Sequence, residues 1–175
     1  MAGRKRNQKR SKLEVFSKAT LLANYILDTT RRAPRGARGH VVDRLNNHAI
    51  DVLEHILSAN NIRIDETMDP DHMVRRAQLR IGHQEDAKTT LMLLPNVAWL
   101  ARTCGAITKK QFEVICQETD EVSRMMKAWM QRDRQRFAKI LQAHGLDENA
   151  LERTTTDTPA TLFERDDLPY VAELE

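Results

Sequence analysis

Two histidines and an aspartate share one flank of a helix predicted near the middle of the chain. His48, Asp51 and His55 lie at positions i, i+3 and i+7, so all three project from nearly one side of an α-helix. Imidazole and carboxylate groups are competent ligands for zinc or iron. A di-metal site in a helical bundle also needs ligands from other helices, and no second helix offers a matching Glu-x-x-His pair. We therefore interpret these residues as a polar flank with an Asp–His pair, and we expect no metal and no cofactor.

The sequence lacks the motifs on which common enzyme mechanisms depend. It contains no phosphate-binding loop, no dinucleotide-binding glycine pattern, no Gly-x-Ser-x-Gly elbow and no His-Glu-x-x-His zinc motif. The acids are mostly interleaved with bases on faces predicted to meet solvent, so no poised pair of carboxylates is evident. These absences predict a binding protein without catalytic residues.

Composition indicates a helical protein with one domain and two appendages. The 175 residues are 41% hydrophobic and 30% charged, and glycine and proline are scarce. No apolar run reaches the ~18 residues that a membrane span needs. The N-terminus lacks the apolar core of a secretory signal. Cys104 and Cys116 lack metal-site spacing and are predicted to be reduced, buried thiols. We expect a cytoplasmic protein with no membrane partner.

Charge is distributed unevenly along the chain. The formal net charge is +3, but residues 1–12 contain no acid, whereas residues 146–175 contain nine acids and two bases. The first segment is predicted to be a disordered basic arm, and the last a largely disordered acidic tail. Clustered bases bind phosphates by releasing counterions, so the arm is expected to contact RNA or DNA. Its candidate contacts are Arg4, Lys5, Arg6, Lys9, Arg10 and Lys12.

The clearest helix start lies late in the chain, where Gly105 ends the preceding segment. Thr108 and Gln111 have the spacing of a capping box. Beyond them, apolar residues recur at steps of three and four, which predicts one apolar stripe on a helix that continues to about Ala143 and ends at Gly145. This stripe comprises Phe112, Ile115, Thr119, Val122, Met126 and Trp129.

Three further helices are expected before it. The first covers about 13–32, with Leu13, Phe16, Thr20, Ala23 and Ile26 or Leu27 on one face. The second covers about 37–62, with a stripe of Val42, Leu45, Ala49, Val52, Ile56 and Ala59. The third begins near Asp69 or Asp71, tolerates Pro70 in its first turn and should kink or break at Pro95. Its buried face comprises Leu91, Leu94, Ala98 and Ala101.

Four amphipathic helices with short links predict an all-α, up-down-up-down four-helix bundle over residues 13–145. The third and fourth helices carry apolar residues around more than one face, so we also expect self-association through leftover apolar surface. Trp99 and Trp129 are the predicted core or interface anchors. The other residues of this surplus are Met92, Leu93, Val97, Leu100, Met125 and Met130.

The order and spacing of four segments resemble a known family. These segments are LEVFSKA near Phe16, the TTRRAPRGARGHVVDRLNNHAIDVLEHILSANN run, the turn CGAITKKQFE and the segment VSRMMKAWMQ with Trp129. From Leu13 to about Arg132, the chain resembles the accessory variability determinant proteins of diversity-generating retroelements. These are related to the four-helix-bundle proteins encoded in 23S rRNA intervening sequences. The basic arm, the acidic tail, Pro95 and Lys127-Ala128 depart from the family pattern.

The resemblance implies a bundle that assembles into a homopentameric ring with a positively charged surface. It also implies a non-catalytic protein that binds a reverse transcriptase and its template RNA and supports mutagenic reverse transcription. The alternatives left open are a helical protein–protein scaffold and a general RNA-binding bundle unrelated to reverse transcription. Carried onto this chain, the candidate RNA or polymerase contacts are Arg31, Arg32, Arg35, Arg38, Arg75, Arg76, Arg80, Arg124 and Arg132.

Overall fold

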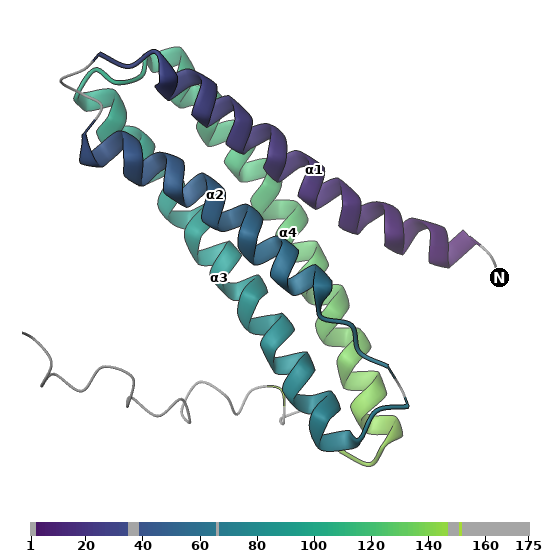
Figure 1. Ribbon diagram of the computed structural model, residues 1–175. Coiled ribbons are helices and arrows are strands. Elements are labelled where there is room, and N and C mark those ends of the chain that lie inside the picture. The colour runs from purple at the N-terminus through teal and green to yellow at the C-terminus, as the bar shows by residue number, and fades with distance from the viewer. Residues whose placement is uncertain (1–2, 35–38, 66, 147–150, 152–175) are drawn as a thin grey trace, which may run out of the picture.

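The computed structural model contains four long α-helices (Figure 1). It describes residues 3–34, 39–65, 67–146 and 151, with side chains described from residue 14 onward. No strand occurs among these residues. The acidic tail predicted for residues 146–175 lies almost entirely outside this part of the chain. The helices are α1 (Gly3–Arg31), α2 (His40–Asn61), α3 (Pro70–Thr103) and α4 (Lys109–Ala143).

The four helices form the up-down-up-down bundle that the sequence predicts. Each helix packs against the next in the chain, and α1 also packs against α4, which closes the bundle. Consecutive helices run in opposite directions (Figure 1). One end of the bundle therefore combines the end of α1, the start of α2, the end of α3 and the start of α4. We call this the α1–α2 end, and the other the α2–α3 end.

The predicted start of α4 is confirmed in detail. Thr108 Oγ1 accepts a hydrogen bond from the Gln111 backbone N–H, and the Gln111 side chain accepts one from the Thr108 backbone N–H at 2.7 Å. Gly105 has a φ of 74°, the left-handed conformation that glycine adopts without a Cβ penalty. Gly145, with a φ of 71°, follows the C-terminus of the same helix.

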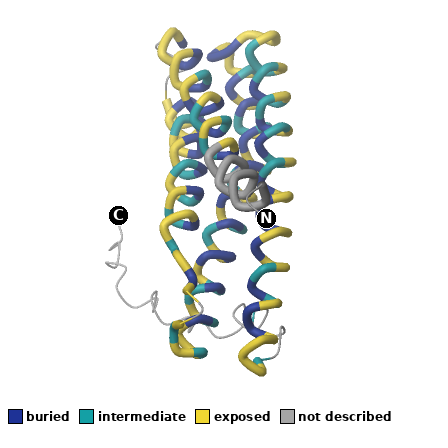
Figure 2. Tube along the Cα trace, turned by 90° about the vertical axis from the view of Figure 1, so that its right-hand side faces the viewer, coloured by how far each residue is buried: buried dark blue, intermediate teal, exposed yellow. Residues whose placement is uncertain are grey.

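The apolar stripes of three helices point inward as predicted (Figure 2). Every stripe residue of α2 is buried, as are the four residues predicted for α3. In α4 the stripe is buried except Phe112, which is half-buried. Helices of this length are stable in water because such stripes cover one another.

Helix α1 differs from its prediction in its start and in its central face. Its backbone is helical from Gly3, well before the start expected near Leu13. Lysine and arginine are good helix formers, and no proline interrupts this segment. The buried face is centred on Val15, Ala19, Leu22 and Ile26 rather than on Phe16 and Thr20, which are half-buried. The face is offset because α1 packs against both α2 and α4.

Helix α3 tolerates both of its prolines. Pro70 occupies the first turn, and Asp69 caps the helix by accepting a hydrogen bond from the His72 backbone N–H at 3.3 Å. The break expected at Pro95 does not occur, because α3 continues to Thr103. Packing of Leu94 and Ala98 on either side of Pro95 buries apolar surface that offsets the lost hydrogen bond.

The core has two parts along the bundle. The larger part is built from all four helices and includes Trp129. The smaller part is built around Met73 from α3 and Phe137 from α4, at the α2–α3 end. Towards its N-terminus α1 diverges from the other helices, so this end is built mainly from α2, α3 and α4 (Figure 1).

The apolar surplus predicted for α3 and α4 is divided between core and surface. Met130 is buried, and Met125 and Val97 pack against the core. Of the predicted surplus on α3, the side chains that stay exposed are Met92, Leu93, Trp99 and Leu100. Within the described residues, none of the helices has a stretch both long and apolar enough to cross a bilayer.

Candidate nucleic-acid interface

The corner between α1 and α2 carries two of the predicted arginine contacts. Arg31 ends α1, Arg32 follows it, and both side chains are exposed. The Thr30 hydroxyl lies 2.9 Å from the Ile26 carbonyl and 2.8 Å from Asn46 Oδ1, which holds the last turn of α1 against α2. The other two predicted contacts of this corner, Arg35 and Arg38, lie outside the described residues.

The end of α3 and the start of α4 add an aromatic and basic cluster at the same end. The guanidinium carbon of Arg102 lies 4.9 Å from the Trp99 ring centroid and 5.7 Å from that of Phe112. The two rings meet edge to face, with centroids 5.8 Å apart. Lys109 and Lys110 begin α4 beside them, with exposed side chains. An exposed aromatic ring among bases is the arrangement on which unpaired nucleotide bases stack.

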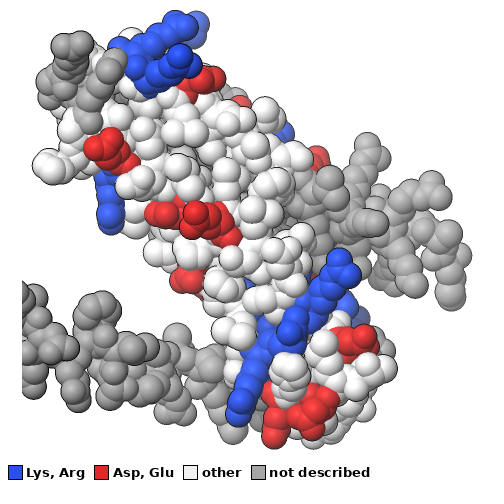
Figure 3. Space-filling model, viewed as in Figure 1, with Lys and Arg blue, Asp and Glu red and all other residues white. Residues whose placement is uncertain are grey.

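Basic side chains gather at both ends of the bundle, and the middle of the face in Figure 3 carries mainly acidic ones. Arg75 and Arg76 lie at the α2–α3 end, where Arg76 Nε donates a hydrogen bond to the Arg63 carbonyl at 2.8 Å. A pocket of about 440 Å³ lies at the same end. Its lining comprises Phe16, Ile56, Leu57, Asn60, Ile62, Arg63, Ile64, Arg80, Arg136 and Phe137.

The prediction that Arg80 contacts RNA or a polymerase from the surface is wrong, because its side chain is only 4% exposed. Its Nε donates a hydrogen bond to Asp133 Oδ2 at 2.8 Å, and Nη2 lies 2.7 Å from the same oxygen without hydrogen-bond alignment. Nη1 donates to the carbonyls of Ala59 and Ile62. Arg80 therefore joins α3 to α4 and to the end of α2 inside the bundle. Its guanidinium carbon lies 5.4 Å from the Trp129 ring centroid.

The remaining predicted contacts do not join the α1–α2 end. Arg124 and Arg132 are exposed along α4, and each Nε donates to a carbonyl of its own helix, of Asp120 and Ala128 respectively. The side chains of the basic residues in 1–12 lie outside those described. The predicted set is thus spread over both ends and one helix face, instead of forming one surface.

The loop between α2 and α3 is closed by an aspartate. Asp65 Oδ1 accepts hydrogen bonds from the Thr67 backbone N–H at 3.1 Å and from the Thr67 hydroxyl at 3.0 Å. These bonds favour the charged carboxylate and hold the pKa of Asp65 below its ordinary value.

An ion pair links α1 to α4. Lys18 Nζ lies 3.0 Å from Glu121 Oε1, and the hydrogen bond to Glu121 raises the pKa of Lys18 above its ordinary value.

The three polar residues on the flank of α2 are not equivalent. His48 is buried, and its Nδ1 lies 3.6 Å from Asp51 Oδ2, in agreement with the predicted Asp–His pair. His55 instead faces α3, where Asp86 Oδ2 lies 3.9 Å from its Nδ1. The sequence interpretation missed this cross-helix partner because it searched for Glu-x-x-His and not for other spacings of a histidine and a carboxylate.

Comparison with known proteins adds no relative. None of the protein-family models, curated proteins or solved structures compared with this chain matches it. The family resemblance therefore depends on the quoted segments alone.

Proposed function

We propose that this protein is a non-catalytic nucleic-acid-binding bundle whose α1–α2 end contacts RNA. The observation that carries the proposal is the exposed Trp99 beside Arg102, at the same end as Arg31, Arg32 and the lysines that begin α4. Bases supply phosphate contacts, and an aromatic face supplies stacking that tolerates any nucleotide. This combination favours single-stranded RNA over a polyanion that has charge but no bases to stack.

The more specific form of the proposal comes from the family resemblance. In that form the bundle is an accessory of a diversity-generating retroelement, where it binds the reverse transcriptase together with the template RNA. A four-helix bundle with basic ends agrees with this role. The genome tests it directly: a reverse-transcriptase gene is expected beside this one, and its product should co-purify with the bundle.

RNA binding is tested with single-stranded RNA over a range of salt concentrations. The logarithm of the affinity should fall with the logarithm of salt by about 0.7 for each phosphate contact. The double variant Arg31→Glu/Arg32→Glu should lower the affinity at least about tenfold and flatten this slope. Its matched control is Arg75→Glu/Lys139→Glu, which changes the net charge equally at the α2–α3 end. Equal losses in both variants would show that only total charge matters and would remove the α1–α2 end from the site.

The stacking component has a separate test. Trp99→Leu retains an apolar side chain but removes the ring, and stacking of one base contributes about 1–3 kcal/mol. We expect at least about a fivefold loss of affinity with an unchanged salt slope. An unchanged affinity would leave a basic surface without a stacking platform.

Two results would change the functional assignment. RNA binding without a reverse-transcriptase partner would indicate a general RNA-binding bundle. Absence of RNA binding even at low salt would favour a protein–protein scaffold. One observation supports the scaffold. Met92 on α3 is 66% exposed and lies in the uncharged segment 89–101, and exposed apolar surface of this kind marks protein–protein contacts.

A further inference from the structure

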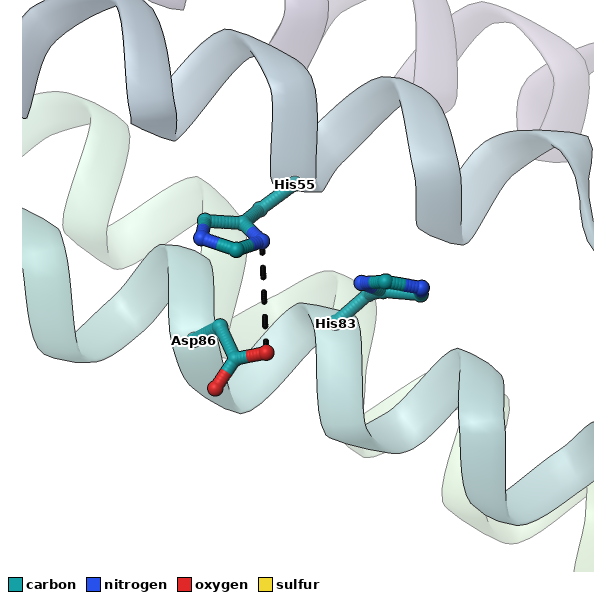
Figure 4. Close-up of side chains that lie close together, drawn as sticks. All are labelled: His55, His83 and Asp86. Atoms are coloured by element: carbon teal, nitrogen blue, oxygen red, sulfur yellow. Dashed lines mark ion pairs between the residues drawn. The ribbon is translucent and has the colours of Figure 1, made fainter. Parts of the chain in front are cut away.

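His55, His83 and Asp86 come together at the contact between α2 and α3. His55 projects from α2, while His83 and Asp86 lie one turn apart on α3 (Figure 4). One ligand atom from each residue lies within 4.8 Å of the other two. The two imidazole rings have centroids 6.1 Å apart and are tilted by 35°. The three side chains thus converge from two helices on one small volume.

We propose that these three residues form a site for a divalent transition metal, best suited to Zn²⁺, that links α2 to α3. Two imidazoles and one carboxylate make a common three-ligand set for zinc, in which the fourth position is taken by water or another ligand. Because zinc has no d-electron preference for geometry, it tolerates ligands placed by helix packing rather than by a dedicated loop.

The distances are compatible with closure around an ion. Tetrahedral ligands at about 2.0–2.1 Å from zinc lie roughly 3.4 Å from one another. The three side chains therefore need to approach by about an ångström. The side chains of His55 and Asp86 are 33% and 60% exposed, so they have room to change rotamer.

The hydrogen bonding of His83 favours a ligand at this place. Its Nδ1 is buried and has no hydrogen-bond partner. An unpaired buried polar atom raises the free energy of the folded protein, and a bond to a metal ion or to another ligand would remove this cost. An ion pair between His55 and Asp86 does not account for this atom, because it leaves His83 Nδ1 without a hydrogen-bond partner.

The test uses the full chain, stripped with a chelator and titrated with Zn²⁺ in an isothermal calorimeter. We expect one ion per chain and a higher thermal midpoint in the presence of zinc. Loss of an outer-shell partner already costs zinc sites 10–100-fold. Replacing a ligand, as in His83→Ala or Asp86→Asn, should therefore lower the affinity by more than about tenfold. The matched control is His72→Ala, an exposed histidine in the first turn of α3.

His83→Ala could lose zinc because the variant fails to fold. Asp86→Asn keeps the shape of the side chain, so a loss of zinc binding in this second variant reports on the lost ligand. Co²⁺ gives a second readout in the unmodified protein, because four-coordinate cobalt absorbs visible light far more strongly than six-coordinate cobalt. One zinc per chain, lost in both ligand variants and kept in the control, would support the site. Weak binding that persists in both ligand variants would overturn it and leave a plain His55–Asp86 ion pair.

Discussion

At the scale of single residues, the structure departs most from the sequence interpretation at Arg80. On α3 this arginine falls near Arg75 and Arg76, and by spacing alone it continues a basic surface. Its partner Asp133 is 53 residues away on α4 and 1% exposed. Nothing local indicates the pairing, because charged residues surround Asp133 in the sequence. Buried ion pairs of this kind are visible only once two helices have been placed side by side.

The buried pair gives a stability prediction. Arg80→Met or Asp133→Leu alone should lower the free energy of unfolding by about 3–5 kcal/mol, because each leaves the other charge buried and uncompensated. The double variant Arg80→Met/Asp133→Leu should lose much less than the two single losses combined, as measured by urea unfolding. Lys88→Met is the control, since it breaks only the exposed Lys88–Glu85 pair and should cost less than about 1 kcal/mol. Additive losses would contradict a coupled pair.

The two cysteines should differ in reactivity. Burial, assisted by the charge of Asp120, raises the pKa of the Cys116 thiol above its ordinary value. A raised pKa lowers the thiolate fraction at any pH below it, so Cys116 should be alkylated more slowly than the exposed Cys104 near pH 8. Peptide mapping after timed iodoacetamide treatment measures both rates. The rates should converge in urea, and equal rates in the folded protein would refute the prediction. The sequence interpretation of both thiols as buried is wrong for Cys104, which is exposed, and is met only in part by Cys116, which is half-buried.

At the scale of the helices, sequence patterns predict whatever depends on neighbours in the chain. The capping box of Thr108 and the stripe of α2 from Val42 to Ala59 were both predictable, because caps and periodicity are local properties. The buried face of α1 was less predictable. Val15 and Phe16 are both apolar, and only the contacts of α1 with two other helices determine which of them is buried. His83 and Asp86 were missed for a related reason: their significance depends on His55 across the α2–α3 contact.

Two glycines test how backbone conformation affects the stability of the helices. Gly105→Ala should destabilise the protein by about 1–2 kcal/mol, because a residue with a Cβ pays for the positive φ of 74° even though the surrounding space is open. Gly82→Ala should instead stabilise it by about 0.5–1 kcal/mol, since Gly82 lies inside α3 and a Cβ there meets nothing within 4 Å. Thermal unfolding should show shifts of opposite sign. Two shifts of the same sign would refute the backbone argument.

At the scale of the whole molecule, α3 carries an uncharged apolar face that reaches the basic α1–α2 end. Leu93 and Leu100 lie on one line of α3, seven residues apart, at 42% and 52% exposed, and Leu100 is in the last turn of the helix. No charged residue occurs between Thr89 and Ala101. An uncharged helix face of this kind is more often covered than left in water. A self-associating bundle would bury this face in the assembly, with the bases of the α1–α2 end at its border.

The exposed apolar face of α3 predicts the solution mass and how to change it. After nuclease treatment and at moderate salt, light scattering should give a multiple of the 20.2 kDa chain mass, and the ring implied by the family resemblance requires about five times that value. Leu93→Glu/Leu100→Glu should reduce the mass to that of one chain while leaving helicity intact, because charge on the α3 face prevents its burial. The control Leu21→Glu alters an even more exposed leucine, on α1, and should leave the mass unchanged. A monomeric wild-type protein would eliminate the ring and leave the α3 face to a different partner, of which the reverse transcriptase is the first to test.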